Sequence, residues 1–273
     1  MSRTKRQWLG WVRLAPVALA AMAVWASWEG QNEVWLQVSR AKETWRQGNP
    51  GQAIDIYRSI YERYPDSRYT PEVLWELATL HYLQEGEADL AAHYFGVLGG
   101  HYPAHPLASK ALYRQGEIYE KDLDDNRRAV QIWQSLLQRA GLQAEERQHV
   151  LLSLASAYYK TEHFEQARQC LEDLLSQAKG GETAQRARVL AGTIDQLLSR
   201  YQRSVDVLQE VLRYPDCPDC RLQAQLALIQ SYEFLDRLPQ ALQVAREIPS
   251  ERFPAEMKAD LIARLRDKQR LDP

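Results

Sequence analysis

Two cysteines three positions apart are the side chains of this sequence best placed for covalent chemistry. Cys217 and Cys220 stand in the segment YPDCPDCR. In an exported domain the two thiols can close a small local disulfide, or both can stay free in a loop. A catalytic thiol–disulfide pair usually lies in a strand–helix–strand context, which this sequence lacks, so a redox protein is the lesser alternative. A closed zinc site needs four ligands, and Cys170 is the one cysteine left over.

The other candidates for chemistry are weaker. His101 and His105 share the segment GGHYPAHP without a nearby carboxylate, and we expect solvated loop residues. The acidic segment DLDDN at 122–126 lacks the glycine and the closing glutamate of a calcium loop, which favours a turn between helices. No nucleophile elbow, zinc-protease motif, phosphate loop or dinucleotide fingerprint is present. The sequence therefore predicts no enzymatic activity, no cofactor and no metal.

The bulk composition describes an all-α protein. Of the 273 residues, 45% are apolar and 26% are charged, with a net charge of −2. Nucleic-acid binding needs a basic excess on one face, so the sequence predicts no such partner. Gln, Leu, Ala, Arg and Glu dominate, and these residues favour helices. Runs of β-branched residues are absent.

The first thirty residues differ from the rest. Residues 8–28 contain one charge, Arg13, and a helix of this length spans roughly 31 Å. Tryptophans stand near both ends of the span, as at membrane interfaces. Basic residues precede the span and acidic residues follow it. The positive-inside rule therefore predicts a single span in a bacterial inner membrane, with the bulk of the chain on the periplasmic side.

A cleaved signal peptide is the alternative reading of this segment. Residues 14–25 form a plausible apolar region, and Val24-Trp25-Ala26 offers a small-residue cleavage site. Cleavage would leave a soluble periplasmic protein. No cysteine follows the apolar run, so a lipoprotein signal is absent.

The elements that must position any site are repeated helix pairs. Small residues recur at a period of 37 or 38 residues: Ala53, Ala91, Ala129, Ala167, Ser204 and Ala241. Side chains three, four and seven residues after each small residue are mostly apolar, which defines one buried face of a helix. Cys170 falls in one of these columns, so we interpret it as a core cysteine. Pro65 and Pro103, each in a Tyr-Pro pair, end two of these helices, because proline cannot continue a helix.

A second helix precedes each of these. Its aromatic column holds Tyr82, Tyr119, Tyr158 and Tyr232, with Thr44 and Asp195 as exceptions. Three residues before this column the side chains are small, except at Ile229, and a small side chain lets two helices approach closely. The small residues are Ala41, Thr79, Gly116, Ala155 and Gly192.

These columns resemble the tetratricopeptide repeat, whose pattern is W-x2-L-G-x2-Y, then A-x3-F, then P. The resemblance covers about residues 34–250 in six units, with a period longer than the usual 34. Segments such as YRSIYERYPDSRYTPEVLWELATLHY are similar to bacterial envelope proteins of this class, of the β-barrel-assembly lipoprotein and Tol–Pal coordinator type. The resemblance implies an α-solenoid of six helix pairs.

The predicted organisation has three parts. Residues 1–30 form the membrane anchor or signal segment, residues 31–253 form the repeat superhelix, and residues 254–273 form a capping helix. The resemblance implies a membrane-anchored scaffold that binds a protein or peptide in a groove lined by the first helix of each pair. We expect groove-facing side chains at Trp45, Glu76, Leu80, Tyr113, Glu117, His149, Tyr159 and Lys160.

Overall fold

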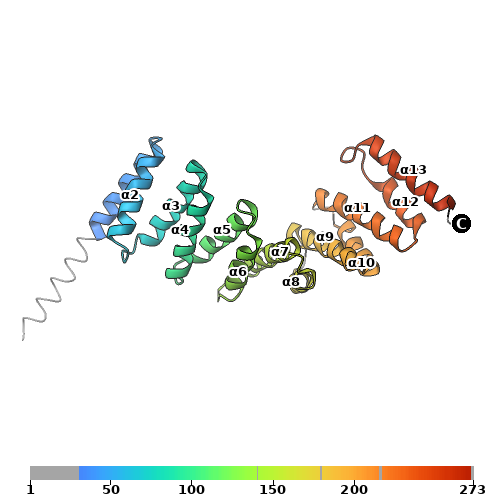
Figure 1. The fold of residues 1–273 in the computed structure, drawn as a ribbon, viewed down its shortest axis with the longest axis horizontal. Helices are drawn as coiled ribbons and strands as arrows, with labels where there is room; N and C mark the ends of the chain where they lie inside the picture. The colour runs from blue at the N-terminus through green and yellow to red at the C-terminus, as the bar shows by residue number, and fades with distance from the viewer. Residues whose placement is uncertain (1–30, 140, 179, 215–216, 272–273) are drawn as a thin grey trace, which may run out of the picture. The chain divides into compact units, whose positions relative to one another are not determined.

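Every element of regular structure in the described part of the chain is a helix (Figure 1). The computed structural model describes residues 31–139, 141–178, 180–214 and 217–271. The helices are residues 31–46, α2 (Pro50–Arg63), α3 (Thr70–Leu80), the π-helix η1 (His81–Glu85), α4 (Ala88–His101), α5 (Ala108–Lys121), α6 (Asn126–Leu137), α7 (Ala144–Lys160), α8 (Phe164–Gln177), α9 (Glu182–Leu197), α10 (Tyr201–Leu212), α11 (Pro218–Phe234), α12 (Leu238–Glu247) and α13 (Ala255–Leu271).

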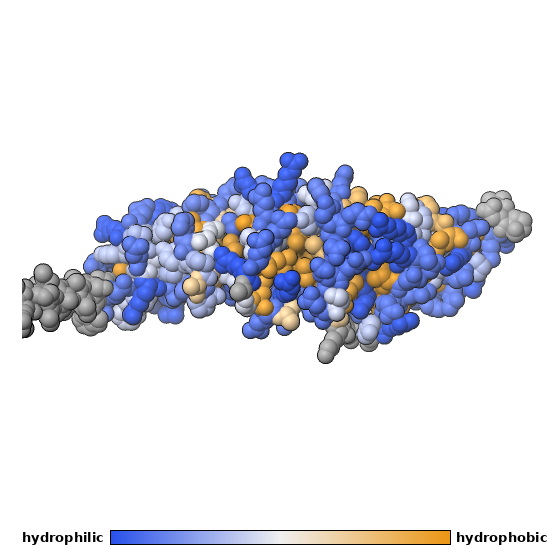
Figure 2. Space-filling view, turned by 90° about the horizontal axis from the view of Figure 1, so that it is seen from below, coloured by the Kyte–Doolittle hydropathy of each residue, from blue (hydrophilic) through white to orange (hydrophobic). Residues whose placement is uncertain are grey.

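The chain divides into two compact units, one ending at Ile118 and the other beginning at Tyr119. In the first unit α2 packs on α3, and α3 packs on α4. In the second unit each helix from α6 to α13 packs on the next one along the chain. These consecutive pairs make an all-α helical solenoid, as the sequence predicts. On the face drawn in Figure 2, hydrophilic side chains cover most of the surface and hydrophobic side chains reach it in separate patches.

The predicted register of the second helices is confirmed by burial. All six small residues, from Ala53 to Ala241, are fully buried. The side chains four and seven positions later are also buried, among them Trp133 and Leu136 in α6. Each small residue donates its N–H to the carbonyl four residues earlier, at the start of its helix. The column therefore marks the same position in the first turn of every second helix. The column three positions later is mostly half-buried.

The turn inside each helix pair uses one backbone conformation. The residue five positions before each small residue has a positive φ, between 49° and 82°. Glycine adopts this left-handed region without strain, yet only the first two pairs have it. The six residues are Gly48, Gly86, Asp124, Glu162, Ser199 and Asp236.

The second pair departs from the sequence register by one residue. His81, rather than Tyr82, takes the place of the aromatic column: its carbonyl accepts the N–H of Glu87, as the Tyr119 carbonyl accepts that of Asp125. Ala78, three residues before His81, is fully buried, whereas Thr79 is half-buried. The π-helix η1 holds one extra residue per turn, and it turns Tyr82 out of the column. The assignment of Tyr82 to the aromatic column is therefore wrong.

The repeated Tyr-Pro pairs end helices as predicted. Helices α2 and α4 stop one residue before Tyr64 and Tyr102. The Tyr102 hydroxyl donates a hydrogen bond of 2.7 Å to the Pro65 carbonyl. The second Tyr-Pro turn is thus tied to the first one.

The predicted membrane span, residues 8–28, lies outside the described residues. Among the helices that the structure describes, none has the length and apolar character needed to cross a bilayer. The anchor and the signal peptide therefore both stay sequence predictions.

Cys217 and Cys220 form a disulfide at the start of α11. Both cysteines are buried, and the Cys217 Sγ also accepts the backbone N–H of Cys220 at 3.3 Å. Cys170 is a free cysteine and is half-buried rather than fully enclosed. Its burial, followed by the charge of Asp173, raises the pKa of the Cys170 thiol to about 11.

Candidate binding site

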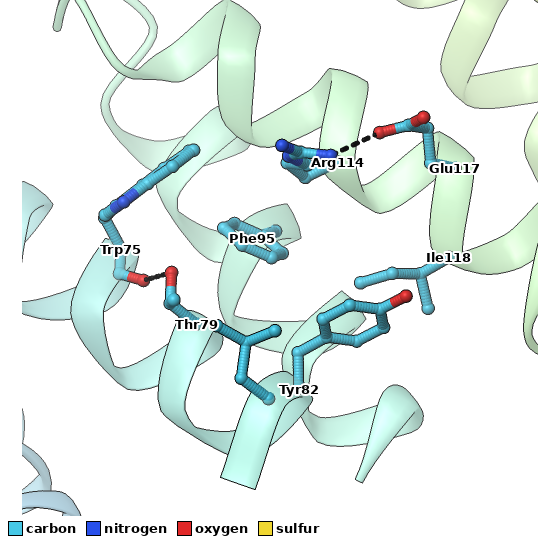
Figure 3. Close-up of a pocket in the computed structure, with 8 residues that line it drawn as sticks. Trp75, Thr79, Tyr82, Phe95, Arg114, Glu117 and Ile118 are labelled. Atoms are coloured by element: carbon cyan, nitrogen blue, oxygen red, sulfur yellow. Dashed lines mark hydrogen bonds and ion pairs between the residues drawn. The ribbon is translucent and has the colours of Figure 1, made fainter. Parts of the chain in front are cut away.

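A pocket in the first unit lies between α3 and η1 on one side and α5 on the other, with α4 below it. Its cavity volume is about 260 Å³. Figure 3 shows how side chains from these helices converge on this space. The lining residues are Trp75, Thr79, Tyr82, Leu83, Phe95, Arg114, Glu117 and Ile118. We call it the Tyr82 pocket.

The floor of the Tyr82 pocket is aromatic. Phe95 follows the small residue Ala91 by four positions and is buried by the register of α4. Its ring meets the Trp75 ring edge to face, with centroids 5.2 Å apart. Lys110 holds its Nζ 5.1 Å from the centroid of the Trp75 ring. These packed rings hold the floor in a fixed shape.

The mouth of the pocket is formed by the π-helix. Tyr82 and Leu83 are 38% and 61% exposed, although both are large and apolar. They project outward because η1 changes the helical phase, while His81 stays buried behind them. The His81 Nδ1 lies 2.6 Å from the Glu87 Oε2, and its ring stacks on Tyr94 at 5.5 Å. These contacts hold η1 in place.

One wall of the pocket carries an ion pair. The Arg114 Nη1 lies 2.8 Å from the Glu117 Oε2, and both residues are on α5 (Figure 3). In Figure 3 the ring of Tyr82 lies beside Ile118, across the pocket from Arg114. The site therefore offers apolar walls and a polar edge that can fix the orientation of a ligand.

The size of the pocket fits a side chain better than a whole small molecule. Ligand pockets usually span about 300–1,000 Å³, and this cavity holds about 260 Å³. No group of three or more His, Cys, Asp and Glu side chains within the described residues is arranged to hold a metal ion. The arrangement suits insertion of one apolar side chain from a partner.

Of the five predicted groove residues in the first unit, one lines this pocket. Glu117 forms its polar edge, whereas Tyr113 on the same helix is half-buried. Trp45 is half-buried and packs against the core between the first helices. Leu80 is fully buried in that core, so its assignment to the groove is wrong. The reason is that Leu80 follows Leu77 by three residues on the buried face of α3.

Glu76, the remaining prediction in this unit, is half-buried on α3. Desolvation raises the pKa of its carboxyl, and Lys42, whose Nζ lies 3.9 Å away, acts in the opposite sense. The charge of Glu76 adds to burial in raising the pKa of the Tyr57 hydroxyl. Glu76 is thus part of the packing between helices, outside the Tyr82 pocket.

The other three predicted residues belong to the second unit. His149 on α7 is exposed. Tyr159 is half-buried, with its ring centroid 6.0 Å from that of Phe164. The Lys160 Nζ lies 3.2 Å from the Glu120 Oε1. The described contacts do not bring these three side chains into one pocket.

Sequence reasoning missed most of the Tyr82 pocket. Spacing places Tyr82 in the aromatic column, because a π-helix leaves no mark in the spacing of a single repeat. Leu83 gives a signal, since it is a large apolar residue next to the aromatic column. The structure also bears on the predictions for His105 and for the acidic segment at 122–126. His105 is half-buried, with its Nε2 3.3 Å from the Glu72 Oε1, whereas the acidic turn caps α6 through Asp125 as a helix–helix turn.

The sequence matches the tetratricopeptide repeat family model at residues 35–67, 110–140 and 149–180. No curated protein matches it significantly.

Solved structures share the fold at low sequence identity. A tetratricopeptide repeat protein from Parabacteroides merdae is 14% identical with a TM-score of 0.57, covering 87% of each chain. A structure titled MamA protein is 13% identical with a TM-score of 0.54, covering 65% of this chain and 89% of that one. A putative kinesin light chain from Podosopora anserina, with TPR-like repeats, is 17% identical with a TM-score of 0.52, covering 75% and 98%. The chain therefore carries tetratricopeptide repeats within a helical solenoid of the kind found in solved tetratricopeptide repeat proteins.

Proposed function

We propose that this protein is a non-enzymatic scaffold that binds a protein partner by taking one apolar side chain into the Tyr82 pocket. The observation that carries the proposal is the pair of exposed residues Tyr82 and Leu83 at the mouth of an aromatic pocket. Exposed apolar side chains that rim a pocket are typical of interaction sites. The Arg114–Glu117 pair at the edge would orient the main chain or a polar neighbour of the inserted residue.

The apolar character of the pocket favours Leu, Ile, Met or Phe as the inserted side chain. Burying such a side chain contributes about 1.5–3 kcal/mol, which is one contact of a larger interface rather than a complete affinity. The solenoid supplies further surface for the rest of the partner.

A photo-crosslinker tests the site in its native setting. We would place p-benzoylphenylalanine at Leu83 in the full chain, irradiate, and compare the products with those from the same residue placed at Leu90. Leu90 is a matched control, because it is also an exposed apolar residue and lies outside the pocket lining. We expect a discrete adduct from position 83 that is lost when Tyr82 is changed to Ser. Equal adducts from both positions would reject the pocket as the binding site.

We also propose that the scaffold is anchored in a bacterial envelope by residues 8–28. Support comes from the nearly uncharged span, the basic residues before it and the tryptophans at its ends. Anchoring would raise the local concentration of the repeats at the membrane. Carbonate washing, N-terminal sequencing and a reporter fused after Pro273 test this. A soluble protein with a new N-terminus near Ser27 would support the cleaved signal instead.

The alternative of a thiol–disulfide protein finds less support. Cys217 and Cys220 are buried, and their disulfide closes the first turn of α11. A redox site needs an accessible sulfur of low thiol pKa. Insulin reduction by the purified full chain would revive this alternative.

A further inference from the structure

A second pocket, in the second unit, combines a cation with hydrogen-bond donors. It lies at α6, the end of α7 and the turn into α8, with a cavity volume of about 410 Å³. Its lining residues are Arg127, Val130, Gln131, Tyr158, Thr161 and His163, and none of these is acidic. We call it the Arg127 pocket.

The charge of Arg127 is not compensated within the described part of the second unit. The two nearest carboxylates in the sequence already have partners: the Asp125 Oδ2 lies 3.2 Å from the Arg128 Nε, and the Asp124 Oδ1 accepts from Asn126 at 2.9 Å. No ion pair of Arg127 occurs among the residues that the structure describes. A guanidinium donates five N–H bonds in a fork that suits a carboxylate.

Hydrogen bonds fix the other donors around this cavity. The Tyr158 hydroxyl accepts from the Gln134 Nε2 at 2.6 Å, which leaves its own hydrogen for another acceptor. The His163 Nδ1 lies 2.7 Å from the Thr161 carbonyl oxygen. Because a carbonyl only accepts, Nδ1 must carry a hydrogen, so Nε2 accepts a hydrogen bond in the neutral ring and donates one only in the protonated ring.

The next repeat shows what such a position binds. His163 is the N-cap residue of α8, four residues before Ala167, and Arg200 is the N-cap residue of α10, four residues before Ser204. Arg127 and Glu165 likewise stand two residues before the small residues of their own helices. By position in the repeat, His163 therefore corresponds to Arg200, and Arg127 corresponds to Glu165.

In that next repeat a carboxylate occupies the position. The Arg200 Nη1 lies 3.1 Å from one Glu165 oxygen, and its Nη2 lies 2.5 Å from the other. This two-point hydrogen bond, ahead of the other charges, raises the pKa of Arg200. In the Arg127 pocket a cation stands where the next repeat has this carboxylate, so the lining offers the Arg127 guanidinium and the Tyr158 hydroxyl as donors and contains no carboxylate.

We propose that the Arg127 pocket binds a carboxylate on a helical segment of a partner protein, an Asp or Glu side chain that pairs with Arg127 as Glu165 pairs with Arg200. The assignment to a protein partner rests on the proposed scaffold function, whereas the pocket itself consists of residues different from those of the Tyr82 pocket. The side chain of Glu165 is itself presented from a helix, which is why we infer a helical segment.

The experiment follows the ring signals of ¹³C-histidine in the full-length protein during peptide titration. One probe is an acetylated, amidated alanine-based helical peptide with a single central Glu, and the other has Gln at that position. We expect the Glu peptide to shift the His163 signal saturably and the Gln peptide to leave it unchanged. Equal responses to both peptides would overturn the proposal. Sodium acetate is the third probe, and acetate binding as tight as the peptide would exclude the protein-partner assignment.

Two arginine variants locate the contact. Replacing Arg127→Gln should weaken binding of the Glu peptide about tenfold or more, as loss of a charge-assisted hydrogen bond does. Arg128→Gln removes the same charge one residue away, from an arginine that already pairs with Asp125, and should leave binding unchanged. Equal weakening in both variants would mean that only net charge matters and would reject the pocket. Arg127→Lys, which keeps the charge but loses the fork, should bind with intermediate affinity and guards against a folding defect in Arg127→Gln.

The outcome is separable from that of the proposed function. Crosslinking at Leu83 reports the Tyr82 pocket, and the His163 signal reports the Arg127 pocket. Either one can fail while the other holds.

Discussion

The Arg168 guanidinium lies with its Nε 3.1 Å from both carboxylate oxygens of Asp195, whose side chain has no exposed surface. Asp195 stands in the column that holds a tyrosine at Tyr119, Tyr158 and Tyr232. Asp195 departs from the aromatic pattern because it pairs with Arg168 on the preceding helix. A buried carboxylate without such a partner would be strongly destabilising.

This pair predicts an asymmetric mutational response. Arg168→Leu should destabilise the protein by about 3–5 kcal/mol, because it leaves the charge of Asp195 buried and unpaired. Thermal unfolding with hydrogen exchange of α9 would measure the effect. The double variant with Asp195→Leu should recover most of the loss, since two apolar residues need no counter-charge. A double variant as unstable as Arg168→Leu would contradict this account.

The core register predicts the effect of a charge in α6. Leu136 is 1% exposed, so Leu136→Asp should unfold the middle of the second unit, at a cost above about 3 kcal/mol. Circular dichroism and the melting temperature would report it. Ser135→Asp, one residue away on the exposed side, is the matched control and should change the melting temperature little. Wild-type melting of Leu136→Asp would show that the register is wrong.

The left-handed turn residues predict stabilising substitutions. Glu162 has φ +62° and Ser199 has φ +57°, in a region that only glycine enters without strain. Glu162→Gly and Ser199→Gly should each raise the free energy of unfolding by about 0.5–1 kcal/mol, measured by urea denaturation. The same change at exposed Gln166, inside α8, should lower it by about 1 kcal/mol. A loss of stability at Glu162 would mean that its side chain contributes more than the strain costs.

The pKa of Cys170 predicts slow alkylation. Burial raises this pKa to about 11 from the usual 9.0, so the thiolate fraction at any pH below about 9 is lower than that of a free thiol. Iodoacetamide should therefore react with the folded protein at pH 8 at least about tenfold more slowly than with the urea-unfolded chain. Because the pKa is raised, the rate should increase as the pH approaches 11. Equal rates in the folded and unfolded chains would refute the burial of this thiol.

The sequence alone determined the class of fold, because spacing encodes burial. The recurring small residues from Ala53 to Ala241, and the apolar side chains at fixed offsets after them, are the buried faces of successive helices. The sequence also predicted where two helices end, at Pro65 and Pro103, because proline cannot continue a helix. These features depend on residues near one another in the chain.

Tertiary structure decided the sites, because they depend on contacts between helices and on local helical phase. The π-helix shifts Tyr82 out of the aromatic column and into a pocket mouth, and no spacing rule reveals that shift. Leu80 looked like a groove residue by period, yet the packing of α2 on α3 buries it. The partner of Asp195 lies on another helix, so only the folded chain shows that this carboxylate is paired. The folded chain also shows that Arg127 lines a pocket without an acidic residue in its lining.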